Sequence, residues 1–160
     1  MGAEQKVAII TGASQGLGEA ILKGYRDRNW RVVANSRNIK PSTDPDVLTV
    51  AGDIGDPEVA ERTVKQALGH FGRIDTLVNN AGITRDNLFV QLRDEDWDDV
   101  IAVNLTATFR LARAATKLMM RKRFGRIIAI TSIVGVTGNP GQGNYTASKA
   151  GIIEIGRAHV

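Results

Sequence analysis

Cysteine is absent from this sequence and histidine occurs only twice, so several kinds of site are excluded. Without cysteine the chain can form no disulfide, supply no thiol nucleophile and hold no cysteine-ligated zinc. His70 and His159 stand alone, and no group of His, Asp and Glu has the spacing of metal ligands. We therefore expect no metal site, and we expect a structural role for His70 at the end of a predicted helix, where a cation is favoured.

Long apolar runs are also missing, so the sequence predicts no membrane-spanning segment and no apolar signal sequence. The net charge of +4, from 21 Lys and Arg against 17 Asp and Glu, is too small to indicate nucleic acid binding. The 160 residues are 42% hydrophobic and 24% charged, which is ordinary for a globular protein. These properties predict one cytoplasmic domain spanning residues 1–160.

Short apolar runs alternate with segments of helical periodicity. Runs at 6–11, 31–35, 47–51, 74–79 and 126–131 have the β-branched content of buried strands. Helices are predicted at about 16–28, 56–71 and 94–121, and the last has an apolar stripe of Trp97, Ile101, Leu105, Thr108 and Ala112. A loop at 38–46 replaces the helix expected between two strands. This alternation predicts a doubly wound α/β fold with a parallel sheet in three layers.

A glycine-rich turn follows the first predicted strand and opens the first predicted helix. Gly12, Gly16 and Gly18 permit a tight turn and a close approach of backbone N–H groups to a diphosphate. Their spacing differs from the commoner Gly-x-Gly-x-x-Gly, and glycine-rich turns can serve packing alone. The position between strand and helix favours dinucleotide binding.

The second strand leads into Asn35-Ser36-Arg37, with no carboxylate where NAD sites usually bind the ribose hydroxyls. Arg37 could pair with a 2′-phosphate and Ser36 could donate to it, so we predict NADP(H) in preference to NAD(H). The alternative for Arg37 is a solvated loop cation. Asp53, after the third strand, is a candidate for contact with the adenine edge or for a turn.

Tyr145 and Lys149 stand four residues apart, thirteen residues after Ser132. On a helix this spacing puts the phenol and the amine on one face. The pKa of a free tyrosine hydroxyl is about 10. A neighbouring cation favours the phenolate and lowers this pKa. The pair is therefore predicted to exchange a proton with a substrate. Taken singly, Tyr145 and Lys149 could be surface residues, and Ser132 could simply end a strand.

Taken together, the motifs resemble those of the short-chain dehydrogenase/reductases in order and spacing. The matching residues are Thr11 to Gly18, Asn79-Asn80-Ala81-Gly82, Asn104, Ser132, Tyr145 and Lys149. Residues 83–151 are most similar to the members that reduce 3-oxoacyl-[acyl-carrier-protein]. The resemblance implies a Rossmann-type sheet with further strands after the Tyr145 helix, which this sequence lacks. We therefore expect a C-terminally incomplete member whose fifth strand is an apolar sheet edge.

The resemblance also implies roles for the matching residues. Tyr145 would protonate a carbonyl oxygen as hydride arrives from nicotinamide, and Lys149 would favour the phenolate and bind the nicotinamide ribose. Ser132 would polarise the carbonyl, and Asn104 would help to hold a water that relays protons through Lys149. The expected cofactor-binding residues are Gly12, Ser14, Gln15, Gly16, Leu17, Gly18, Ser36, Arg37, Asp53, Ile54, Asn79, Ala81, Gly82, Tyr145 and Lys149.

Arg123 belongs to a basic cluster at the end of the long helix and, by the resemblance, would meet an acidic acyl carrier protein. A helix C-terminus also favours cations without any partner. The resemblance further implies a homo-oligomer, a tetramer assembled through the long helix and the Tyr145 helix. The leading prediction is an NADP(H)-dependent reductase of a 3-oxoacyl thioester. The alternatives are a dehydrogenase for another small alcohol or ketone, and an inactive nucleotide-binding fragment.

Overall fold

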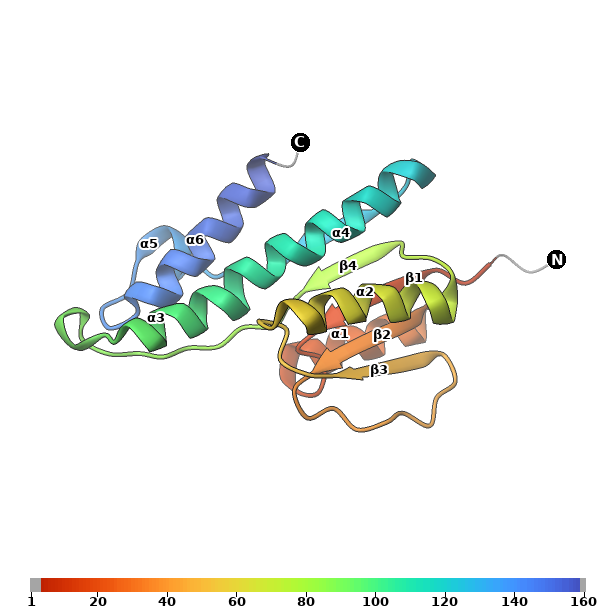
Figure 1. Ribbon diagram of the computed structural model, residues 1–160, viewed down its shortest axis with the longest axis horizontal. Helices are drawn as coiled ribbons and strands as arrows, with labels where there is room; N and C mark the ends of the chain where they lie inside the picture. Colours follow the sequence, from red (N-terminus) through yellow and green to blue (C-terminus); the bar gives the residue numbers. More distant parts are fainter. Residues whose placement is uncertain (1–3, 159–160) are drawn as a thin grey trace.

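Five parallel strands form the sheet in the computed structural model, which describes residues 4–158 (Figure 1). They are β1 (Val7–Thr11), β2 (Arg31–Ser36), β3 (Val47–Ala51), β4 (Thr76–Asn79) and β5 (Arg126–Ala129). Their order is β3-β2-β1-β4-β5, so the chain first builds outward from β1 and then continues on its other side. In open sheets of this kind, ligands bind outside the carboxyl ends of the strands where the order reverses, here between β1 and β4.

Helices cover both faces of the sheet, which confirms the predicted three-layer α/β fold. The helices are α1 (Gly16–Asp27), α2 (Pro57–Phe71), α3 (Asp94–Ile101), α4 (Ala107–Lys122), α5 (Val134–Thr137) and α6 (Gly143–Ala158), with a short 3-10 helix η1 (Phe89–Gln91). Because side chains alternate along a strand, Ile9 faces α2 and α4, whereas Ile10 faces α1. None of the helices within residues 4–158 is long and apolar enough to cross a membrane. His159 lies outside the described residues.

The predicted strands are present; the third has the predicted ends, and each of the others differs at one end. The fourth begins at Thr76 instead of residue 74, and the fifth ends at Ala129 instead of residue 131. β5 is the last strand of the order and is partly exposed, with Ile128 at 40% of its full exposure. Within the described residues, β5 therefore forms an apolar edge, as the sequence predicted.

The long helix predicted at 94–121 is interrupted by a π-helix, η2 (Ala102–Thr106), which joins α3 to α4. The predicted apolar stripe is partly wrong: Trp97 is 40% exposed, and Leu105 lies against Gly151 of α6. Thr108 and Ala112 of the predicted stripe are buried, and the residues that α4 contributes to the main core are Ala107, Leu111, Ala115 and Met119. A π-turn accommodates one extra residue, so a single helical period cannot describe both halves of this segment.

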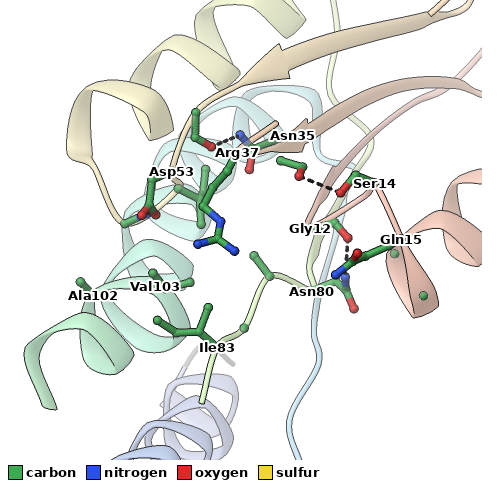
Figure 2. A pocket seen from close by; sticks show the side chains of 18 of the residues that line it. Gly12, Ser14, Gln15, Asn35, Arg37, Asp53, Asn80, Ile83, Ala102 and Val103 are labelled. Carbon is green, nitrogen blue, oxygen red and sulfur yellow. Dashed lines mark hydrogen bonds between the residues drawn. The ribbon is translucent and has the colours of Figure 1, made fainter. Parts of the chain in front are cut away.

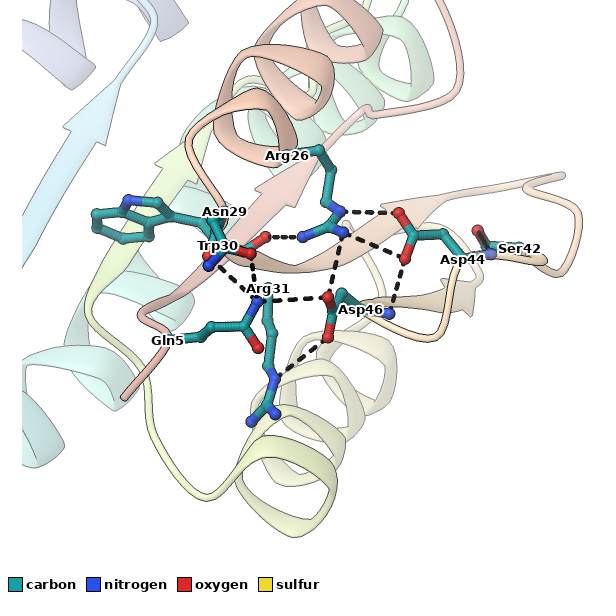
Figure 3. A network of polar contacts seen from close by, with 8 residues as sticks. All are labelled: Gln5, Arg26, Asn29, Trp30, Arg31, Ser42, Asp44 and Asp46. Carbon is teal, nitrogen blue, oxygen red and sulfur yellow. Dashed lines mark hydrogen bonds and ion pairs between the residues drawn. The ribbon is translucent and has the colours of Figure 1, made fainter. Parts of the chain in front are cut away.

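The connection between β2 and β3 contains no helix, as predicted, and a network of polar contacts holds it in place (Figure 3). The guanidinium of Arg26 lies 2.8 Å from the Asp44 carboxylate and 3.2 Å from that of Asp46. Arg31 lies 3.4 Å from Asp46, and the Asp46 backbone N–H donates to Asp44. Each partly exposed ion pair contributes about 0–1 kcal/mol, but together they join the loop to α1 and β2. These contacts fix the end of the loop directly before β3.

Candidate active site

The glycine-rich turn lies at the carboxyl end of β1, against the segment that follows β4. Gly12 and Gly16 have φ angles of 64° and 56°, which glycine adopts readily and other residues rarely do. A Cβ added to Gly18 would lie 2.0 Å from the carbonyl oxygen of Gly12. The Asn80 side chain donates to the carbonyl oxygens of Thr11 and Gly12, at 3.1 and 3.2 Å. These contacts fix the turn at the start of α1, where a helix favours an anion.

A cavity of about 560 Å³ lies beside this turn, and Figure 2 shows the side chains around it. Its volume falls within the range of small-molecule sites. Twelve of the residues predicted to bind a cofactor line it: Gly12, Ser14, Gln15, Gly16, Leu17, Gly18, Ser36, Arg37, Asp53, Ile54, Ala81 and Gly82. Asn79 is 5% exposed and does not line the cavity, whereas its neighbour Asn80 does. The glycine turn fits a dinucleotide diphosphate, since Gly16 adds no side chain and no atom lies within 4 Å of the place where its Cβ would be.

Two hydroxyls and a guanidinium gather at the end of β2. The Ser14 and Ser36 Oγ atoms are 2.8 Å apart. Arg37 is exposed, points into the cavity in Figure 2, and makes no hydrogen bond or ion pair with any residue of 4–158. Asp53 has the predicted turn role, since its carboxylate accepts from the Gly55 backbone N–H at 2.8 Å, and it also lines the cavity. This corner can bind an anionic group.

A second cavity, of about 400 Å³, contains Tyr145 and Lys149. It adjoins the first, because Asn80, Gly82 and Ile83 line both. Ser132 does not line it; its hydroxyl accepts from the backbone N–H of Val134 at 3.4 Å, at the start of α5. The structure therefore brings the predicted Tyr–Lys pair to a cavity that adjoins the one beside the glycine turn, whereas Ser132 lines neither cavity.

Lys149 is buried, with 4% of its surface exposed. Its Nζ donates to the carbonyl oxygen of Ile130 at 2.8 Å and lies 5.6 Å from the centroid of the Tyr145 ring. Burial lowers the pKa of the Lys149 ammonium group, because a charged group loses hydration there. The amine is thus held beside the phenol by a strand-end carbonyl.

Asn104 is fully buried in the π-helix, and its side chain binds the segment between β4 and α3. Its Oδ1 accepts from the Ile83 backbone N–H at 2.8 Å, and its Nδ2 donates to the Ile83 carbonyl at 3.0 Å. A Cβ added to Gly82 would lie 3.5 Å from Lys149 Nζ and 3.6 Å from Asn104 Oδ1. Asn104 and Lys149 therefore face the same side of Gly82.

Several residues that shape the site were not singled out from the sequence. Asn80 stands in a recognised motif, but only its contacts with Thr11 and Gly12 show that it braces the glycine turn. Asn144 is fully buried and donates to the Arg85 carbonyl at 2.9 Å, which attaches the start of α6 to the wall of both cavities. Its place directly before Tyr145 was the one signal available in the sequence.

Arg123 lies away from both cavities, at the exposed C-terminal end of α4. Its φ of 52° and its backbone bonds to Met119 and Met120 make it the cap of this helix. The backbone of Arg123 therefore ends α4, and its side chain is exposed.

We expect Lys149→Met to stabilise the fold at neutral pH. Burial lowers the pKa of Lys149 in the folded state. Below that pKa the buried ammonium group therefore reduces the free energy of unfolding by its full amount. The cost fades as the pH rises to the unfolded-state pKa of about 10.4. The variant should raise the free energy of unfolding by about 1 kcal/mol at pH 7. Urea unfolding at several pH values measures this, with Lys117→Met as an exposed control. A gain of equal size at pH 7 and pH 10 would contradict the assignment.

Known proteins resemble the chain along almost its whole length. The family model of the short chain dehydrogenases matches residues 6–159. The 3-oxoacyl-[acyl-carrier-protein] reductase FabG of Escherichia coli (strain K12) is 44% identical, over 99% of this chain and 67% of that protein. The FabG of Staphylococcus aureus (strain Mu50 / ATCC 700699) is 38% identical, over 94% of this chain and 65% of that protein. Nodulation protein G of Rhizobium sp. (strain N33) is 46% identical, over 94% of this chain and 64% of that protein. This chain therefore belongs to the short chain dehydrogenase family, and it spans about two thirds of the length of these relatives.

Proposed function

We propose that this protein is an NADP(H)-dependent reductase that converts a 3-oxoacyl thioester of acyl carrier protein to the 3-hydroxyacyl form. The observation that carries the proposal is the junction of the two cavities, where a dinucleotide-sized site opens onto Tyr145 and Lys149. The relatives named 3-oxoacyl-[acyl-carrier-protein] reductase, at 44% and 38% identity, support the substrate class.

In the proposed reaction a bound nicotinamide cofactor supplies the hydride. The turn from Gly12 to Gly18 binds the diphosphate through backbone N–H groups. The Tyr145 hydroxyl gives its proton to the carbonyl oxygen, which becomes the product hydroxyl. Lys149 favours the resulting phenolate and binds the nicotinamide ribose.

Two further residues complete the proposed site. Ser132 directly follows Ile130 and Thr131, which line the second cavity after β5. It donates to the carbonyl oxygen and stabilises the charge that develops there. Asn104 holds, with Lys149, the water through which Tyr145 is reprotonated. The burial of Asn104 and its shared position with Lys149 beside Gly82 support this role.

Arg37→Ala should reduce the preference for NADPH over NADH by about tenfold or more, because a charge-assisted bond to the 2′-phosphate is lost. The affinities of the two cofactors are measured by fluorescence titration at one salt concentration. Lys40→Ala is the matched control, since Lys40 is an exposed cation of the same loop that does not line the cavity. An equal loss of affinity for NADPH and NADH would show that Arg37 is not a 2′-phosphate ligand.

The substrate class is tested by following NADPH oxidation with an acetoacetyl thioester, carried either on acyl carrier protein or on a small thiol. Arg123→Glu should lower kcat/KM about tenfold for the carrier-protein substrate and leave the small thioester unaffected. Arg28→Glu, at an exposed arginine at the end of α1, is the control.

Turnover of simple ketones, sugars or steroids in place of both thioesters would favour another dehydrogenase. NADPH binding without turnover, unchanged by Tyr145→Phe, would favour a nucleotide-binding fragment.

Assembly into a homo-oligomer and a cytoplasmic location stay predictions. Analytical ultracentrifugation of the purified chain tests the first, and a monomer at all concentrations would refute it. Fractionation of the source cells tests the second, and recovery outside the cytoplasmic fraction would refute it.

A further inference from the structure

Ser148 is fully buried on α6, directly before Lys149, and lines neither of the two cavities. Its Oγ lies 2.7 Å from the carbonyl oxygen of Tyr145, to which it donates. The same Oγ lies 3.1 Å from Nδ2 of Asn104, from which it accepts. One hydroxyl therefore joins the turn of α6 that carries Tyr145 to the π-helix.

The polar groups of Asn104 are almost completely used by these contacts. The two hydrogens of Nδ2 go to the Ile83 carbonyl and to Ser148 Oγ, while Oδ1 accepts from the Ile83 backbone N–H. Ser148 has a single hydrogen, and donating it to Tyr145 makes its oxygen an acceptor for Asn104. A reversed amide would turn N–H groups toward the Ile83 N–H, so Ser148 and Ile83 together define the orientation of Asn104.

We propose that Ser148 is a positioning residue that acts through Asn104. It holds the amide with Oδ1 toward the space beside Gly82, which Lys149 Nζ also faces. It also sets the distance between the first turn of α6 and the π-helix. The catalytic consequence rests on the proposed reductase function, whereas the control of Asn104 by Ser148 does not.

Removal of the hydroxyl would leave one Nδ2 hydrogen of Asn104 without a partner at a fully buried position, which disfavours the observed orientation. The amide would then rotate or the first turn of α6 would move away from the π-helix. Either change displaces groups around Lys149 and Tyr145, whereas the turn from Gly12 to Gly18, proposed to bind the diphosphate, makes no hydrogen bond to Ser148 or to the Asn104 side chain. The expected kinetic effect is therefore a lower kcat with little change in KM for the cofactor.

The direct test measures hydrogen exchange of the Asn104 side-chain amide by NMR in the full chain. Ser148→Ala should accelerate this exchange about three- to tenfold, since one hydrogen bond is lost. Thr63→Val is the matched control: Thr63 is also fully buried and donates to a carbonyl of its own helix, Val59, at 2.8 Å, but α2 lies outside the site. The control should leave the Asn104 amide unchanged.

A second measurement separates positioning from stability. Ser148→Ala should lower kcat and shift its pH profile, while Ser148→Thr, which keeps a hydroxyl, should restore both. If Ser148→Ala does not fold, Ser148→Cys keeps a similar volume with a weaker hydrogen bond and should show the same faster exchange.

Unchanged Asn104 exchange in the Ala or Cys variant would overturn the proposal, as would equal acceleration in Thr63→Val. Absence of turnover in the unmodified chain with every carbonyl would count against the proposed function alone. The amide exchange would then still decide whether Ser148 controls Asn104.

Discussion

Tyr145→Phe is expected to lower kcat about 10²- to 10⁴-fold, the usual contribution of a positioned proton donor, and to leave NADPH affinity within about twofold. The hydroxyl makes no hydrogen bond to any residue in the described part of the chain, and Tyr145 lines the second cavity. The ring, which lies against Lys149, is retained in the variant. Loss of turnover would therefore report the missing proton donor and not a disturbed fold.

The control for this variant is Tyr25→Phe. Tyr25 is partly buried on α1, where its ring packs edge-on against Trp30 at 5.0 Å, away from both cavities. Thermal unfolding should be nearly the same for both variants, and Tyr25→Phe should keep full turnover. A Tyr145→Phe chain that reduces the thioester at the rate of the unmodified protein would remove Tyr145 from the mechanism.

The sheet could be predicted because its inner strands β1, β2 and β4 are buried on both faces, and so appear as short apolar runs that need no alternation. The spacing of Tyr145 and Lys149 predicted a shared helix face, and α6 does bring both to one cavity. The missing helix before β3 was visible as a segment with proline and serine. In each case the signal lies within a few neighbouring residues.

The π-helix and the hydrogen bonds around Asn104 could not be predicted in the same way. A π-turn changes the hydrogen-bond partner by one residue, and no pattern of apolar residues marks that change in 102–106. The roles of Ser148 and Asn144 depend on partners 44 and 59 residues away in sequence, Asn104 and Arg85. Such contacts exist only after the helices have packed, so a single sequence names the residues without showing what they bind.

Gly18→Ala should remove cofactor binding and destabilise the fold, by about 3 kcal/mol if the turn absorbs the clash. The new Cβ would lie 2.0 Å from the Gly12 carbonyl oxygen and 2.7 Å from the Asn80 side-chain nitrogen. The carbonyl belongs to the backbone of the turn, and Asn80 bonds it at 3.2 Å, so neither neighbour can move without displacing the other. Because the N–H groups proposed to hold the diphosphate belong to this turn, NADPH affinity should fall about tenfold to hundredfold.

Two other glycines of the same region separate this clash from the general effect of adding a methyl group. Gly16 has a φ of 56° but no atom within 4 Å of an added Cβ, so Gly16→Ala should cost only the backbone strain of about 1 kcal/mol. Gly24 lies inside α1 with its nearest neighbour 3.8 Å away, so Gly24→Ala should stabilise the helix by about 0.5–1 kcal/mol. Urea unfolding and NADPH titration should therefore rank Gly24→Ala above Gly16→Ala, and Gly16→Ala above Gly18→Ala. If Gly18→Ala and Gly16→Ala were equal in both measurements, the close contact between Gly18 and Gly12 would not be what shapes the cofactor turn.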